Sequence, residues 1–72
     1  MKIEQETKWI VDDLTEFSVD DDVEVILTSG EKIIGTIDWM DGGEATVDSE
    51  KMGNVMISID DVEEISHVDL SN

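Results

Sequence analysis

Residues 25–41, Val-Ile-Leu-Thr-Ser-Gly-Glu-Lys-Ile-Ile-Gly-Thr-Ile-Asp-Trp-Met-Asp, hold the pattern that decides the fold. At the start of this segment the side chains alternate with a period of two, as in a strand with one buried face. Residues 28–31 have the composition of a turn, in which Gly30 is free to adopt a positive φ. The strand pattern resumes over residues 32–40 and is interrupted by Gly35, which marks a bulge or a sharp bend. The segment therefore predicts two adjacent strands, the second of them bent.

Three further short strands are expected downstream, over residues 44–48, 55–59 and 64–68. Glycines lie in the turns before the first two of these strands, and residues 60–62 have the composition of a single helical turn. Short strands at regular spacing with glycine at the corners are typical of a small barrel or sandwich.

An N-terminal helix is expected over about residues 3–17. Its apolar face has the three-to-four-residue spacing of a helix and consists of Ile3, Thr7, Ile10, Val11, Leu14 and Phe17. The chain is therefore expected to be one domain, residues 1–72, that is mainly β. The helix would precede a five-stranded, strongly bent antiparallel barrel over about residues 22–68.

The charge balance is the strongest compositional signal. Twenty acidic residues stand against four lysines and no arginine, which gives a formal net charge of −16. Direct binding to nucleic acid depends on lysine and arginine displacing counterions, so it is disfavoured, as is an anionic membrane surface. A basic protein surface, such as that of a nucleic-acid-binding protein, is the favoured partner. Solubility or adaptation to high salt explains the acidity equally well.

The composition also bounds the chemistry and the compartment. The chain has no cysteine, and it lacks both a signal-peptide core and the ~20 apolar residues that span a bilayer, so we expect a cytoplasmic location. A chain this short buries only roughly 60% of its unfolded surface, so we expect neither an enzyme nor a cofactor site. The acids Asp38, Asp41 and Glu44 do not match the spacing of an EF-hand, so no metal site is predicted.

The fold-deciding segment resembles the first motif of the Sm-like proteins. The matching positions are Leu27, Gly30, Gly35, Ile37 and Asp41, and residues 53–59, Gly-Asn-Val-Met-Ile-Ser-Ile, are similar to the second motif. The likeness covers about residues 3–68 and implies a helix followed by an Sm-like, SH3-like barrel.

This resemblance breaks at the RNA site. Sm-like proteins typically form rings and bind uridine-rich RNA through an Asn soon after the Asp of the first motif and an Arg before the Gly-Asn of the second. Here Gly42 and Gly43 follow Asp41, and Met52 stands where Arg is expected. The resemblance therefore implies the scaffold without the RNA-binding chemistry.

A looser resemblance, in layout and acidity, is to the acidic Rho-binding antiterminator proteins. Those proteins are thought to act by contact with the RNA-binding surface of a hexameric helicase. This resemblance implies a regulator or inhibitor that mimics nucleic acid.

The candidate protein-binding residues are Trp9, Trp39, Asp20, Asp21, Asp22, Asp38, Asp41 and Glu44. Tryptophan is enriched at binding hot spots, and acids at the rim of an interface steer a basic partner. Packing in the core is the alternative role for each tryptophan. Ile37 and Met40 are expected to take the inward face beside Trp39, and the methionines at 40, 52 and 56 are expected to fill the core.

The leading interpretation is a small acidic protein-interaction module, a regulator or inhibitor that docks on a basic protein surface. Two alternatives stay open: a ring-forming Sm-like protein that binds RNA at a non-standard site, and a structural subunit of a larger assembly. Both alternatives would make the chain part of an oligomer.

Overall fold

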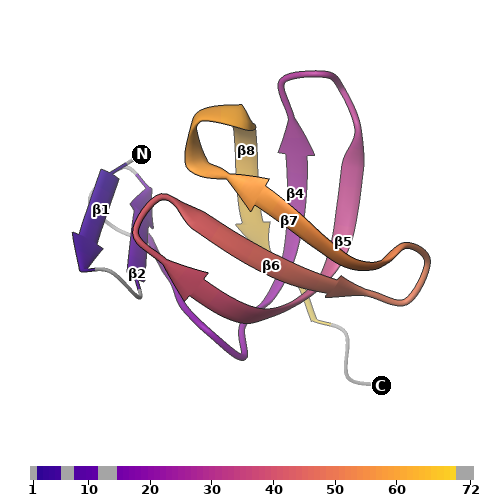
Figure 1. The fold of residues 1–72 in the computed structure, drawn as a ribbon, viewed down its shortest axis with the longest axis horizontal. Coiled ribbons are helices and arrows are strands. Elements are labelled where there is room, and N and C mark those ends of the chain that lie inside the picture. The colour runs from indigo at the N-terminus through magenta and orange to yellow at the C-terminus, as the bar shows by residue number, and fades with distance from the viewer. Residues whose placement is uncertain (1, 6–7, 12–14, 70–72) are drawn as a thin grey trace.

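The computed structural model describes residues 2–5, 8–11 and 15–69, and these residues form eight strands and one short 3-10 helix (Figure 1). In chain order the elements are β1 (Lys2–Gln5), β2 (Lys8–Val11), β3 (Thr15–Phe17), β4 (Asp22–Leu27), β5 (Lys32–Asp41), β6 (Glu44–Ser49), β7 (Gly53–Ser58), η1 (Ile59–Asp61) and β8 (Val62–His67). No helix in this described part of the chain is both long and apolar enough to cross a membrane.

The strands form two antiparallel sheets. The small sheet has the order β1-β2-β3, and the main sheet has the order β7-β6-β5-β4-β8. Figure 1 shows the small sheet beside the turn that joins β5 to β6. The long strand β5 pairs with β4 along its first half and with β6 along its second half, so it connects the two halves of the main sheet.

The expected N-terminal helix over residues 3–17 is wrong. This region instead forms the strands β1, β2 and β3, in which Trp9 lies directly opposite Phe17 and both side chains are fully buried. An aromatic cross-strand pair buries a large apolar area, whereas an isolated helix of this length is only marginally stable in water. Thr7 and Leu14, which were assigned to the helix face, lie outside the described residues.

The expected closed barrel is also wrong. In the described part of the chain, β7 pairs with β6 alone and β8 pairs with β4 alone, so the main sheet has two separate ends. A barrel requires hydrogen bonds between its first and last strands, and here the chain only passes from β7 to β8 through η1. The positions of the five strands and of the helical turn are confirmed, but the architecture is an open, bent sheet.

One apolar core lies between the inner face of the main sheet and the small sheet. It is formed by Trp9, Phe17, Val23, Val25, Ile33, Ile37, Met40, Ala45, Val47, Ile57, Val62 and Ile65. On β4, β6, β7 and the first part of β5, alternate residues face this core, so the residues between them form an outer face that is open to solvent.

Gly35 confirms the expected bend in β5. It lies where β5 ends its pairing with β4 and begins to pair with β6. A Cβ atom at Gly35 would overlap the carbonyl oxygen of Asp48 and would lie 2.9 Å from Cγ1 of Val47. The close passage of β6 over this position therefore requires the absence of a side chain.

Candidate protein-interaction site

A β-bulge at Asp38 sets the direction of the side chains at the end of β5. The register with β6 shifts between Ile37 and Trp39, which leaves Asp38 as the extra residue. Ile37 and Met40 therefore both point into the core, as the sequence predicted, and Trp39 points outward with 42% of its surface exposed. The bulge places an aromatic ring on the outer face of the sheet.

Three side chains lie side by side across the outer face and form what we call the Trp39 row. Trp39 on β5 pairs with Thr46 on β6, and Thr46 pairs in turn with Met56 on β7. Met56 is 62% exposed, the highest value among the large apolar side chains of the described residues. Residues directly opposite on neighbouring strands have Cβ atoms about 5 Å apart, so the row is continuous.

Carboxylates flank the Trp39 row on both sides. On one side Asp41 pairs with Glu44, and on the other side Asp48 lies two residues along β6 from Thr46. The side chains of Asp41, Glu44 and Asp48 are all exposed. The arrangement is an exposed apolar strip between acidic margins, which suits a partner that offers an apolar group between cations.

Trp9, predicted as a possible contact for a partner, is a core residue instead. Its side chain is 0% exposed, and its indole Nε1 donates a hydrogen bond of 2.7 Å to the carbonyl oxygen of Gly42. Gly42 lies in the turn between Asp41 and Glu44 and has a positive φ of 60°. Trp9 therefore contributes to the site by holding the turn that carries two of its acids.

The acidic run of residues 20–22 has mainly local structural roles. The carboxylate of Asp21 accepts a hydrogen bond of 2.8 Å from the backbone N–H of Ser18, and Asp22 accepts one of 2.7 Å from the hydroxyl of Thr36. The backbone N–H of Asp20 donates to the carbonyl of Ile37, so the run lies along β5 just before the bulge. Asp20 is the member of the run that is exposed, with a positive φ of 80°.

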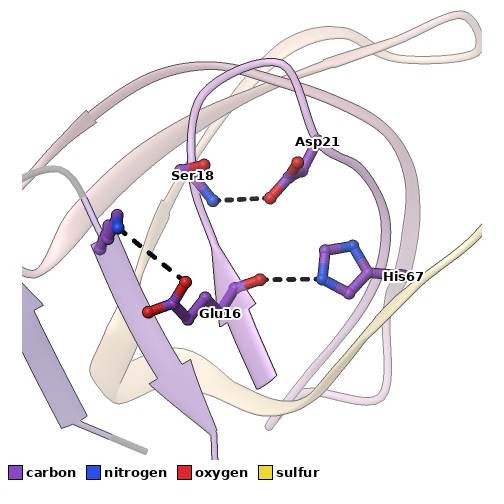
Figure 2. A network of polar contacts seen from close by, with 5 residues as sticks. Glu16, Ser18, Asp21 and His67 are labelled. Atoms are coloured by element: carbon purple, nitrogen blue, oxygen red, sulfur yellow. Dashed lines mark hydrogen bonds and ion pairs between the residues drawn. The ribbon is translucent and has the colours of Figure 1, made fainter. Parts of the chain in front are cut away.

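Figure 2 shows how β3 is attached to the main sheet. The ring nitrogen Nε2 of His67, at the end of β8, lies 2.8 Å from the carbonyl oxygen of Glu16. The same ring stacks on Phe17 with the two centroids 4.3 Å apart. These contacts fix β3 beside the last residue of β8, which is the edge strand opposite β7 in the main sheet.

A hollow lies beside Gly35, on the side of Asp48 away from the Trp39 row. Two lysines, Lys32 and Lys51, line it together with three carboxylates, those of Asp48, Glu50 and Asp69. The charges of these side chains nearly balance. The hydroxyl oxygen of Ser49, in the wall of the hollow, accepts hydrogen bonds from the backbone N–H groups of Lys51 and Met52. No group of three possible metal ligands occurs in the part of the chain that the structure describes.

No family model, curated protein or solved structure matches this chain. The resemblances to Sm-like proteins and to acidic antiterminator proteins therefore stay predictions, and the site is interpreted from its own geometry.

The structure adds three residues to the candidate site, namely Thr46, Asp48 and Met56. The prediction that Met56 and Met52 fill the core is wrong, because both are exposed, whereas Met40 is buried as expected. The alternation of Val55 and Ile57 in the sequence already placed Met56 on the opposite face. The pairing of Met56 with Thr46, and so with Trp39, depends on strand register, which the sequence does not show.

Proposed function

We propose that this chain is a small acidic protein-interaction module that docks the Trp39 row on a basic surface of another protein. The observation that carries the proposal is the exposed pair of Trp39 and Met56 between the carboxylates of Asp41, Glu44 and Asp48. Tryptophan is the side chain most enriched at binding hot spots, and methionine adapts its shape to a partner.

The charge of the chain supports a basic partner. A formal net charge of −16 attracts cationic surfaces over a distance set by the ionic strength, and it repels nucleic acid and other acidic proteins. The module would act as a regulator or inhibitor in the cytoplasm, occupying a surface that its partner otherwise offers to nucleic acid. Long-range attraction would set the association rate, and burial of Trp39 would set the lifetime of the complex.

The test compares proteins captured from a cell extract by the immobilised chain with those captured by two variants. The double variant Trp39→Ala/Met56→Ala removes the row, whereas Ile34→Ala/Met52→Ala removes two apolar side chains of similar exposure elsewhere on the molecule. Each captured basic protein is then purified, and its affinity for all three chains is measured at low and at high salt.

The proposal expects a basic protein that binds the native chain and the Ile34→Ala/Met52→Ala control equally. Loss of the row should weaken that binding by at least about 2 kcal/mol, which is roughly thirtyfold in Kd. Glu44→Gln should lower the association rate and its salt dependence without changing the fold. Equal affinity of all three chains for every basic protein captured would refute the proposal.

A further inference from the structure

The edge strand β7 is unusual in this chain because it carries no charge. Its residues read Gly-Asn-Val-Met-Ile-Ser, whereas each of the other seven strands described contains at least one acidic or basic residue. Natural sheets commonly place charges on their edge strands, because an uncharged edge is a template for pairing with another chain. Met56 of the Trp39 row lies in the middle of this edge.

The hydrogen-bonding groups of β7 that face away from β6 can be assigned from the register. The backbone N–H of Ile59 donates to the carbonyl of Gly43 at 2.7 Å, and the register of β6 and β7 continues from that pair. Inward and outward groups alternate along an antiparallel strand. The backbone groups of Asn54, Met56 and Ser58 therefore point away from the sheet, at its open edge.

The other edge of the main sheet, β8, is less suited to pairing with an added strand. Strand β8 carries the exposed acids Glu63 and Glu64, and its last residue, His67, is held against β3. A second copy of the chain is a poor occupant of β7, because each copy brings a net charge of −16. The charge of the chain favours a cationic segment instead.

We propose that β7 accepts an extended, basic segment of the partner as an added antiparallel strand, continuing the antiparallel pairing of the main sheet. This inference rests on the proposed function and specifies how the partner is bound. In this arrangement an apolar side chain of the added strand lies beside Met56 and lengthens the Trp39 row. Basic side chains two positions before and after it lie on the same face, beside Ser58 and Asn54.

The acids of the site are placed to meet those basic side chains. Ser58 pairs with Glu44, and Asn54 pairs with Asp48, so each acid lies one strand further in than the edge. Strands lie about 4.8 Å apart, so the backbone of the added strand would be about 10 Å from β6. An extended lysine or arginine and the facing carboxylate span this distance together. The partner segment is therefore basic–x–apolar–x–basic.

The test uses a synthetic peptide of sequence TKVLVRT and the full chain. Binding is followed by the change in tryptophan fluorescence, and amide hydrogen exchange is measured with and without saturating peptide. Two further peptides carry one backbone N-methyl group each, on the leucine, whose N–H would face β7, or on the preceding valine, whose N–H would face away. The peptide TEVLVET tests the charges.

Strand addition predicts slower exchange at the amides of Asn54, Met56 and Ser58. It also predicts that N-methylation of the leucine weakens binding by about tenfold or more, whereas N-methylation of the valine has little effect. The acidic peptide should not bind. If TKVLVRT does not bind, or if it binds with unchanged exchange at β7 and equal affinity for both N-methyl peptides, strand addition is refuted. The proposed function would still stand if the Trp39→Ala/Met56→Ala variant loses its basic partner.

Discussion

Replacing Trp9 with phenylalanine should destabilise the protein far more than the same change at Trp39. Trp9 is fully buried, and its indole N–H bonds to the carbonyl of Gly42 across 33 residues of sequence. Trp39 is 42% exposed and has no such bond in the described structure. The two variants therefore compare one substitution in the core with the same substitution on the surface.

The expected cost of Trp9→Phe has two parts. Loss of the donor leaves the carbonyl of Gly42 without its partner, which costs about 1 kcal/mol, because this carbonyl is only partly buried and water replaces some of the bond. The smaller ring also removes apolar atoms equivalent to two or three buried methylene groups, worth about 2 kcal/mol. The total of about 3 kcal/mol is a large share of the roughly 4–11 kcal/mol expected for a domain of this size.

Urea unfolding measures the difference directly, because each variant keeps one tryptophan as a fluorescent reporter. Trp9→Phe should lower the unfolding free energy by about 3 kcal/mol and the Tm by about 12–24 °C. Trp39→Phe should stay within about 0.5 kcal/mol of the native chain. A loss below about 1 kcal/mol for Trp9→Phe, or equal losses for the two variants, would refute the assignment of Trp9 to the core.

Three further outcomes are expected. Gly35→Ala should lower the unfolding free energy in urea by at least about 3 kcal/mol, because the added Cβ meets the backbone of Asp48. Gly53→Ala should lower it by only ~1–2 kcal/mol, the cost of a positive φ for a residue with a side chain. Equal losses for the two variants would contradict the close passage of β6 over Gly35. Thr36→Val should lower the unfolding free energy by about 1 kcal/mol, because it removes the hydrogen bond to Asp22. An unchanged unfolding curve would show that this bond does not stabilise the fold. Raising the salt from about 0.01 to 1 M shortens the screening length from about 30 to 3 Å and should raise the Tm, because it weakens repulsion among the excess acids; a Tm that falls would contradict this.

The five strands of the main sheet could be predicted because each has its own local signal. Val23 and Val25 on β4, and Val55 and Ile57 on β7, alternate with other residues in the sequence and face inward in the structure. Gly35 marked the bend for a reason that the structure explains, since no side chain fits there. The assignment of Ile37 and Met40 to the inward face is confirmed, but the sequence left open whether Trp39 packs against the domain or faces outward.

The N-terminal region could not be predicted in the same way. Ile10, Val11 and Phe17 fit the spacing of a helix, but three-residue and four-residue strands are too short to show a period of their own. The pairing of Trp9 with Phe17 decided the structure, and that pairing is a tertiary contact. Barrel closure failed for a similar reason, because no local pattern tells whether β7 and β8 meet.

The bulge at Asp38 makes the outer surface depend on how β5 pairs with β6 as well as on the composition of β5. If Asp38 were instead paired regularly with β6, with no bulge, the alternation beyond Ile37 would be reversed, so that the indole would turn inward and Met40 outward. The apolar strip on the outer face would then lose its aromatic member without any substitution at Trp39. Recognition by this surface thus depends on the backbone geometry at Asp38 as well as on the identity of the apolar side chains that it exposes.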